Sequence, residues 1–480
     1  MKENSEIVFV QDGKIRKIRL GDTGVSPTTT VLNYLRNSPE HKGCKEGCAE
    51  GDCGACTVVV AELGANEKLK YTAIDSCLVF MPMLHGKQLL TVENLQTGEQ
   101  LHPVQEEMVQ KNGSQCGYCT PGFIMSMLAL YKESKLPGPE EIRDALTGNL
   151  CRCTGYRPIV EAAASACAHN GVDHFTASEK DVIAKLSSIQ KDQSALYHIS
   201  GEQKYFQPQK LADALQLLSE HPDALLLQGA TDIALRVTKK HELLSKILDL
   251  SHVTELKSFS EKGKEVTFGS GMSLEEVKRK SESIFPPLYK MLAVFGSRQI
   301  RSLATFGGNL GSASPIGDTL PVLMALEARI VLQSLKGKRE IPMSEFVTGY
   351  RKTQRMPDEI ITAVIISKMN TNSLISSYKV SKRKDLDIST VSSGFNLTFN
   401  GENISSAILA YGGMAEKTKR AAGAEEFLLG KKWTRENAEK AGELIYTEYT
   451  PLSDARSGAE FRRLAAKNLM LKFWDETQKH

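Results

Sequence analysis

The hydrophobic pattern changes in character several times along the chain. Up to about residue 90, short runs rich in Val, Ile and Leu (SEIVFV, KIRKIRL, CTVVVAEL and QLLTVENL) surround one helical stretch, TTTVLNYLRNS. Short runs of β-branched residues are typical of strands. We therefore predict a small mixed α/β domain over residues 1–92.

The next segment, residues 93–172, has a helical pattern. Thr120 and Pro121 form an N-cap and N1 pair before GFIMSMLALYK, and Pro139 and Pro158 precede two further helical runs. This pattern predicts a small helical bundle. The following residues, 173–198, are polar and lack a strong period, so we expect them to be a linker.

The second half of the chain predicts two further domains. From residue 199 to 372, runs such as LADALQLLSEH and DALLLQGATDIAL alternate helical and strand-like patterns. After residue 373, three strand-like runs (SSYKVSKR, SGFNLTF and SAILAYGGM) come before two helical ones. The sequence thus predicts a multidomain α+β protein.

Composition and charge narrow the function classes. The 480 residues are enough for three or four domains, and apolar and charged residues make up 41% and 24% of the chain. A net charge of +3 is too small to indicate a nucleic-acid or membrane partner. No apolar run is long enough to span a bilayer, and the N-terminus does not resemble a signal peptide. We expect a cytoplasmic protein without stable disulfides.

Four cysteines have the spacing of a plant-type 2Fe–2S ferredoxin. Cys48, Cys53 and Cys56 follow the pattern C-x4-C-x2-C, and Cys77 comes after twenty intervening residues. Gly51 and Gly54 let the backbone of such a loop approach a compact cluster. A structural zinc site normally needs a second close cysteine pair, so zinc is disfavoured here. Cys44 fits no ligand position; it is expected to be a spare thiol, with a ligand swap as the alternative.

A second set consists of two close pairs, Cys116-x2-Cys119 and Cys151-x-Cys153. Four thiolates in this arrangement suit zinc or a 2Fe–2S cluster, and the spacing alone does not choose between them. Cys167 lies in an alanine-rich helical run and is expected to be a small buried apolar residue.

Two glycine-rich segments follow apolar runs, LLLQGATDI at 225–233 and ATFGGNLGSASPIGD at 304–318. Such turns can present backbone N–H groups to phosphate oxygens, and Asp318 could bind a ribose hydroxyl. They could equally be tight turns. No G-x-G-x-x-G follows a strand, so a Rossmann dinucleotide site is not indicated.

Taken together, these motifs resemble one family over residues 5–478. CAEGDCGACTV, QCGYCTPGF and NLCRCTGYRPI resemble the iron–sulfur portion of the xanthine dehydrogenase family of molybdenum hydroxylases. QGATDI, FGSRQIRSLATFGGNLGSASPIGD, GYRKT, SYKVSKRKDLDIS and AYGGMA resemble its FAD portion. The resemblance implies a β-grasp ferredoxin domain (1–92), a helical 2Fe–2S domain (93–172), a vanillyl-alcohol-oxidase-type FAD domain (199–372) and a CO-dehydrogenase-flavoprotein-like C-terminal domain (373–480).

The resemblance also implies which residues bind the cofactors. Cys48, Cys53, Cys56 and Cys77 match the ligands of one 2Fe–2S cluster, and Cys116, Cys119, Cys151 and Cys153 match those of another, so the second set is expected to hold iron rather than zinc. The positions that match flavin contacts are Leu226, Leu227, Gln228, Gly229, Ala230, Thr231, Asp232, Ile233, Phe295, Thr305, Phe306, Gly307, Gly308, Asn309, Asp318, Ile361 and Lys379. No catalytic acid or base is expected on this chain.

The implied function is an electron relay. The family's single-chain members continue into a molybdopterin domain, whereas this sequence ends at His480, so it resembles the small subunit of a split bacterial enzyme. The implied partner is a large molybdopterin-binding subunit, in a heterotetramer or dimer of heterodimers. Electrons would pass through both clusters to FAD and on to NAD, supporting oxidation of hypoxanthine and xanthine to urate. Two alternatives stay open: another molybdenum hydroxylase acting on an aldehyde, nicotinate or carbon monoxide, and a free-standing flavin–ferredoxin protein.

Overall fold

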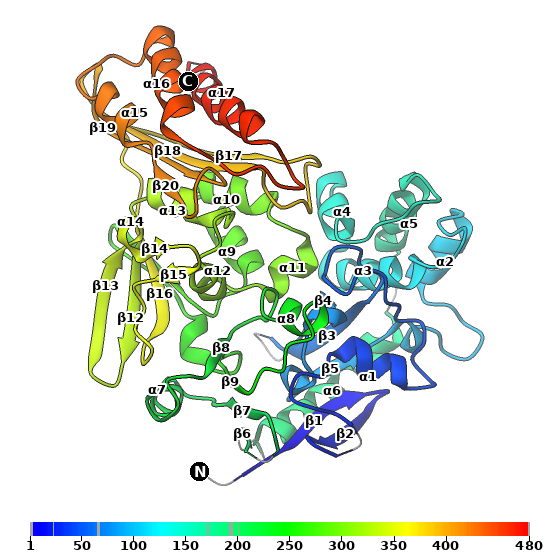
Figure 1. Ribbon diagram of the computed structural model, residues 1–480. Coiled ribbons are helices and arrows are strands. Elements are labelled where there is room, and N and C mark those ends of the chain that lie inside the picture. Colours follow the sequence, from blue (N-terminus) through cyan, green and yellow to red (C-terminus); the bar gives the residue numbers. More distant parts are fainter. Residues whose placement is uncertain are drawn as a thin grey trace. The chain divides into compact units, whose positions relative to one another are not determined.

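The computed structural model describes residues 3–22, 24–64, 68–169, 172–191, 195–199 and 201–478 (Figure 1). The chain folds into two compact units. The first consists of Met1–Gln209, Asp223–His252 and Ser297–Ala304, and the second of Lys210–Pro222, Val253–Gly296 and Thr305–His480. The segment expected to be one FAD domain therefore contributes to both units.

The N-terminal part of the first unit is a five-stranded mixed sheet in the order β2-β1-β5-β3-β4. Its strands β1 and β5 are parallel, and the other neighbours are antiparallel, which is the β-grasp arrangement. The strands are β1 Glu6–Gln11, β2 Lys14–Arg19, β3 Thr57–Leu63, β4 Leu69–Asp75 and β5 Gln88–Leu90.

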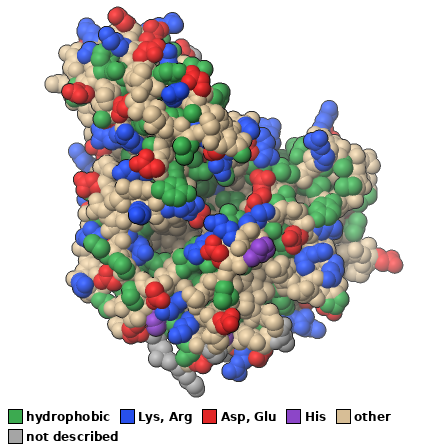
Figure 2. All heavy atoms as spheres, viewed as in Figure 1, with side chains coloured by type: hydrophobic (Ala, Val, Ile, Leu, Met, Phe, Trp, Pro, Cys, Tyr) green, Lys and Arg blue, Asp and Glu red, His purple; other side chains and the backbone are tan. Residues whose placement is uncertain are grey.

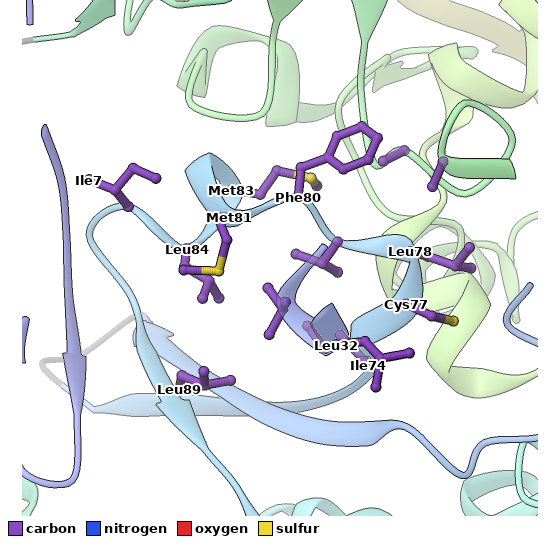
Figure 3. Close-up of a cluster of buried hydrophobic side chains, with 14 of the residues drawn as sticks. Ile7, Leu32, Ile74, Cys77, Leu78, Phe80, Met81, Met83, Leu84 and Leu89 are labelled. Carbon is purple, nitrogen blue, oxygen red and sulfur yellow. The ribbon is translucent and has the colours of Figure 1, made fainter. Parts of the chain in front are cut away.

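Alternating side chains bury both faces of the central strand β3, whereas the edge strand β2 is largely exposed. On one face, Phe9 and Val58 belong to an apolar cluster with Leu32 of helix α1 (Val31–Asn37). Figure 3 shows Leu32 and Cys77 of this cluster. Thr30 begins α1 by accepting a hydrogen bond from the backbone N–H of Asn33. On the other face, Val59 packs with the helical domain. This double burial explains why the strand TVVVAEL is apolar almost throughout.

Four helices form the second domain of the first unit, confirming the predicted helical bundle. They are α2 Pro103–Gln110, α3 Thr120–Glu133, α4 Pro139–Leu146 and α5 Arg157–Ala168. Helix α3 is buried along its length from Gly122 to Leu130 and packs against the other three helices. Two loops, one before α3 and one between α4 and α5, carry the second cysteine set.

Residues 173–198 correct the expectation of a linker. They contain the eighteen-residue helix α6 (His174–Lys191). Its buried residues Val182, Leu186 and Ile189 pack on Val10 and Ala61 of the β-grasp sheet. These three positions have the i, i+4, i+7 spacing of an amphipathic helix, which the polar composition of the segment as a whole obscures.

The first unit also contains a four-stranded sheet in the order β6-β7-β9-β8, with β7, β9 and β8 parallel. These strands are accompanied by the short helix α8, and the segment 297–304 adds helix α11. The elements are β6 Leu196–His198, β7 Lys204–Gln207, β8 Leu225–Leu227, β9 Lys246–Asp249, α8 Ala234–Thr238 and α11 Arg298–Leu303.

The second unit begins with an antiparallel sheet in the order β10-β11-β16-β12-β13 and a small hairpin, β14–β15. Its strands are β10 Phe259–Lys262, β11 Glu265–Gly269, β12 Arg329–Ser334, β13 Gly337–Pro342, β14 Val347–Gly349, β15 Lys352–Thr353 and β16 Ile360–Ser367. Its helices are α7 Leu211–Glu220, α9 Leu274–Ser281, α10 Pro286–Ala293, α12 Phe306–Ser312, α13 Thr319–Ala325 and α14 Met343–Phe346.

The C-terminal part of the second unit is a sheet covered on both faces. Phe395 of β18 faces an apolar cluster with helices α16 and α17, whereas its neighbour Gly394 lies against the backbone of Pro321 in α13. The elements are β17 Ser373–Val380, β18 Val391–Asn400, β19 Asn403–Gly412, β20 Lys419–Arg420, α15 Ala422–Leu428, α16 Arg435–Glu448 and α17 Ala459–Thr477.

The surface agrees with the nearly balanced charge of the sequence. On the face drawn in Figure 2, Lys and Arg side chains are interspersed with Asp and Glu. Within the described residues, no helix combines the length and the apolar character needed to cross a bilayer.

Candidate functional site

Strand pairing brings the first cysteine set together. Cys48, Cys53 and Cys56 lie in the loop that leads into β3, and Cys77 lies in a short 3-10 helix (Ser76–Leu78) directly after β4. Because Thr57 of β3 pairs with Asp75 of β4, the ends of the two segments are adjacent. The thiols of Cys48 and Cys53 interact closely enough to shift each other's pKa, as do those of Cys56 and Cys77.

Backbone amides converge on one sulfur of this set. The N–H groups of Asp52 and Cys53 each lie 3.3 Å from Sγ of Cys48, and that of Glu50 lies 3.5 Å from it. The Cys53 thiol and these amides lower the pKa of Cys48 to about 5, although burial opposes the shift. Such donors stabilise a thiolate, which is the form that binds iron.

Glycines allow the loop to close around the site. Gly51 and Gly54 have φ values of +77° and +67°, which other residues rarely adopt. A Cβ atom on Gly47 would lie 2.7 Å from Sγ of Cys53, and one on Gly54 would lie 2.2 Å from the carbonyl oxygen of Gly148. The loop therefore has the cradle shape and the donors that a cluster with bridging sulfides requires.

Cys44 is buried behind this loop. Its Sγ lies 3.3 Å from Oγ of Ser76, which in turn donates to the carbonyl of Cys56 at 2.7 Å. Burial raises the pKa of Cys44 to about 12. These contacts fit the expected spare thiol, because Cys44 is protonated and bound to a serine rather than grouped with the other four sulfurs.

The second cysteine set lies at the surface of the helical domain. Cys116 and Cys153 are exposed, and Cys119 and Cys151 are partly buried. The thiols pair as Cys119 with Cys151 and Cys116 with Cys153. Burial and the Cys151 contact raise the pKa of Cys119 to about 12. The four sulfurs are thus arranged as two interacting pairs, Cys119 with Cys151 and Cys116 with Cys153.

The loop after α4 holds Cys151 in place. The Cys151 backbone N–H donates to Oη of Tyr156 at 3.0 Å, and the Thr154 hydroxyl lies 3.2 Å from Sγ of Cys151. Tyr156 itself has a φ of +68°. A non-glycine residue in this region is uncommon and marks a turn that the surrounding contacts hold in place.

The two cysteine sets are joined by a direct backbone hydrogen bond. The backbone N–H of Leu150, the residue before Cys151, donates to the carbonyl of Cys53 at 3.0 Å. Both ligand sets belong to the first unit, so this bond connects them within one compact body.

The expected flavin contacts at 226–233 lie at the end of β8 in the first unit. The turn there has consecutive positive φ values at Gly229 (+86°) and Ala230 (+65°). Backbone N–H groups that a turn leaves unpaired can bind an anion. A Cβ on Gly229 would lie 2.0 Å from the carbonyl oxygen of Leu303, at the end of α11.

The remaining expected contacts lie in the second unit. Thr305 is the N-cap of α12 and accepts from the N–H of Gly308, while Gly307 donates to the carbonyl of Ser270 at 2.7 Å. Ile361 lies on β16. Phe295 directly follows Val294, and the carbonyl of Val294 accepts a hydrogen bond from Nζ of Lys379. The residues Thr305–Asn309 thus form the tight helix-initiating turn of α12.

Asp318 and Lys379 form a buried ion pair. Nζ of Lys379 lies 3.0 Å from Oδ2 of Asp318, and Ser389 donates to Oδ1 of Asp318 at 2.5 Å. Both side chains are almost fully buried. The two residues are brought together as a pair that fixes strand β17 beside α13, and both Asp318 oxygens already have donors from the protein.

Several residues at the site were not singled out from the sequence. Asp75 is fully buried beside Cys56, and burial raises its pKa well above the usual value. Asn149, Leu150 and Gln299 connect the segments around the cysteines. They lie inside the motifs NLCRC and SRQIR, but neither the spacing nor the composition of these motifs indicates which residues make contact.

Comparison with protein families assigns all three later domains. Residues 91–164 match the [2Fe-2S] binding domain, residues 199–368 the FAD binding domain in molybdopterin dehydrogenase, and residues 376–477 the CO dehydrogenase flavoprotein C-terminal domain. The match to the [2Fe-2S] binding domain contains Cys116, Cys119, Cys151 and Cys153, which favours iron over zinc for the second set. Xanthine dehydrogenase of Drosophila pseudoobscura pseudoobscura is 32% identical over 98% of this chain, and that of Emericella nidulans is 34% identical over 85%. The chain belongs to the xanthine dehydrogenase family of molybdenum hydroxylases.

The family membership confirms the multidomain α+β fold and the FAD and 2Fe–2S cofactors. The chain spans 39% of the Drosophila enzyme and 34% of the Emericella enzyme. Among solved structures, a chain of carbon monoxide dehydrogenase from Hydrogenophaga pseudoflava has a TM-score of 0.54 at 22% identity, covering 57% of this chain and 96% of that one. Quinoline 2-oxidoreductase from Pseudomonas putida 86 has a TM-score of 0.52 at 24% identity, covering 56% and 94%. These structures share the fold.

Proposed function

We propose that this chain is the small, FAD- and iron–sulfur-carrying subunit of a xanthine dehydrogenase. In this proposal a molybdopterin cofactor on a large partner subunit oxidises hypoxanthine and xanthine to urate. The electrons pass through the second cysteine set, the first set and FAD to NAD. The observation that carries the proposal is the Leu150–Cys53 hydrogen bond, which links two complete four-thiol sets in one compact unit.

Each set would hold one 2Fe–2S cluster, which accepts and releases a single electron when bound. We assign Cys48, Cys53, Cys56 and Cys77 to one cluster and Cys116, Cys119, Cys151 and Cys153 to the other. The chain's own contribution is to hold these thiolates, to supply the amide donors around Cys48 and to limit access of water.

The exposure of the two sets supports the direction of transfer. Cys116 and Cys153 are exposed, where a partner protein can approach, whereas Cys56 and Cys77 are buried. An exposed redox site suits exchange with another protein, and a buried one suits transfer within the chain. This difference favours the second set as the entry point and supports a partner subunit over a free-standing electron carrier.

We also propose the flavin contacts on the two units separately. In the first unit, Leu226–Ile233 would present the backbone N–H groups of their positive-φ turn to the flavin's phosphate groups. In the second unit, the proposed flavin contacts are Phe295, Thr305–Asn309, Asp318, Ile361 and Lys379. FAD supplies hydride exchange with NAD, so the chain needs no acid–base pair for that step.

Anaerobic titration with NADH tests this proposal. The purified full chain should show bleaching of the flavin absorbance followed by loss of the 2Fe–2S absorbance, since the relay is reversible. A Cys151→Ser variant should retain the bleaching of the flavin absorbance. It should lose the part of the 2Fe–2S absorbance change that comes from the second cluster. If dithionite reduces both clusters but NADH reduces neither FAD nor iron, NAD is not the electron acceptor.

The molybdenum partner needs a separate measurement. The chain, isolated with a tag from its own cells, should carry molybdenum and pterin in a fixed ratio to FAD, and the complex should oxidise xanthine. Oxidation of an aldehyde or nicotinate in place of xanthine would reassign the substrate. A preparation that carries FAD and iron with no molybdenum would favour the free-standing flavin–ferredoxin protein.

A further inference from the structure

A buried hydrogen-bond network surrounds the link between the two cysteine sets. The side-chain amide of Asn149 donates to the carbonyl of Gly54 at 3.0 Å and reaches Oγ1 of Thr57 at 3.1 Å. Its Oδ1 accepts from the Ser126 hydroxyl at 2.6 Å. Asn149 is almost completely buried and uses both ends of its amide, so its orientation is fixed.

Asn149 connects the residues next to the proposed ligands. Gly54 follows Cys53 directly, and Asn149 is two residues before Cys151. Together with the Leu150–Cys53 hydrogen bond, the Asn149–Gly54 hydrogen bond makes a two-point clasp between the two ligand loops. Two adjacent bonds hold both separation and orientation, whereas one would allow rotation.

Helix α11 supplies the third member of this network. Nε2 of Gln299 donates to Oδ1 of Asn149 and to Oγ of Ser126, each at 3.0 Å, and the residue has no solvent exposure. On the same helix, Arg301 pairs with Asp144 of α4 at 2.6 Å, and Arg298 pairs with Glu133 of α3. Helix α11 is therefore anchored at several points to the domain that carries the second set.

The segments around these two hydrogen bonds are closely packed. A Cβ on Gly122 would lie 2.2 Å from the carbonyl oxygen of Gly54, and a Cβ on Gly148 would lie 2.1 Å from Oε1 of Gln299. The segments that contain Gly54, Gly122 and Gly148 thus approach each other to backbone contact. Close packing fixes the separation of these segments, and the hydrogen bonds of Asn149 and Gln299 add a defined orientation.

We propose that Asn149 and Gln299 are positioning residues that fix the geometry, and hence the electronic coupling, between the two iron–sulfur sites. This inference rests on the proposed relay. The step moves one electron: an iron held by the second set goes from ferrous to ferric, and an iron held by the first goes from ferric to ferrous. No covalent bond or proton is involved, so its rate depends on separation and orientation, which the network controls.

Two variants of the full chain test the inference. Asn149→Asp preserves volume and replaces the donor that faces the Gly54 carbonyl. Gln299→Leu removes both donors; within the described residues Oε1 of Gln299 has no hydrogen-bond partner, so no accepted bond is lost. The matched control is Gln203→Leu, another buried glutamine of the first unit, which donates to Thr28 and to the Leu244 carbonyl.

Electron paramagnetic resonance gives a readout that does not depend on turnover. In the fully reduced wild type, the two iron–sulfur signals should be broadened by their mutual magnetic interaction. Asn149→Asp and Gln299→Leu should keep the iron content but change this broadening, and the freeze-quenched reduction of the second site by NADH should slow severalfold. Gln203→Leu should match the wild type in both measurements.

The outcomes distinguish the positioning role of Asn149 and Gln299 from the electron relay itself. Variants with full iron, unchanged broadening and an unchanged rate would overturn the positioning role while leaving the relay intact. A wild type in which NADH reduces only the first site would instead remove the relay on which the role depends. If Asn149→Asp loses iron, Gln299→Leu decides, because it leaves the Asn149–Gly54 hydrogen bond in place.

Discussion

At the scale of single residues, backbone geometry fixes identity most strictly at Gly229. This residue combines a φ of +86° with a position at which a Cβ would lie 2.0 Å from the carbonyl oxygen of Leu303. Neither atom of that contact can rotate away, because the Cβ position and the carbonyl oxygen are both set by the backbone. The turn that we assign to flavin binding therefore depends on glycine for two independent reasons.

Gly229→Ala should lower both stability and FAD content. The positive φ alone costs a side-chain-bearing residue about 1–2 kcal/mol, and the clash with Leu303 adds to this cost. Gly98→Ala is the matched control, since Gly98 has a φ of +60° with open space around its Cβ position. The melting temperature and the flavin absorbance per chain measure both effects. Equal losses in the two variants would contradict the close approach.

The buried cysteines Cys44 and Cys77 should respond differently to substitution. They belong to the same apolar cluster, but only Cys77 pairs with another thiol of the first set. Cys44→Ala should keep about four irons per chain, whereas Cys77→Ala should lose the iron of one cluster. Iron analysis after anaerobic purification measures this. Loss of iron in the Cys44 variant would mean that Cys44 is a ligand.

At the scale of secondary-structure elements, His85 ties strand β1 to the 3-10 helix Met81–Leu84. Its Nδ1 accepts from the backbone N–H of Val8 at 2.9 Å, and its ring stacks near that of His252. Burial lowers the pKa of His85 to about 4, and Glu6 only partly opposes the shift. The folded chain thus excludes a proton that the unfolded chain binds below about pH 6.5.

This difference predicts acid sensitivity of the first unit. Stability from His85 is complete above pH 6.5 and falls as the pH drops toward 4, by about 2 kcal/mol at pH 5. His85→Asn retains an acceptor for Val8 and should reduce the fall in melting temperature between pH 7.5 and 5. His241→Asn, at an exposed position, is the control. An unchanged pH dependence in the His85 variant would contradict the argument.

Some helices and strands can be predicted from their sequence pattern alone, and others cannot. The strand TVVVAEL and the helix within TTTVLNYLRNS are predictable because their apolar residues are dense and regular. Helix α6 and strand β4 carry weaker signals: Val182, Leu186 and Ile189 have helical spacing within a mostly polar segment, and LKYTAID alternates only over its first five residues. These two elements become clear only through their long-range partners, the β-grasp core and strand β3.

At the scale of the whole molecule, cysteine spacing predicts both thiol sets but not their connection. The eight proposed ligands come together as two groups of four within the first unit. The Leu150–Cys53 bond and the Asn149–Gln299 network join residues 53–54, 126, 149–150 and 299. No local pattern encodes contacts between segments so far apart in sequence, because packing of the domains determines them.

The central claim is that the chain carries two iron–sulfur clusters and one flavin, and metal and flavin analysis of the anaerobically purified protein tests it most directly. Eight thiolates in two sets predict about four irons and one FAD per chain, without stoichiometric zinc. About two irons with one zinc would mean that the second cysteine set is a structural zinc site. The relay would then lose its entry point, and the claim of two iron–sulfur clusters would be contradicted.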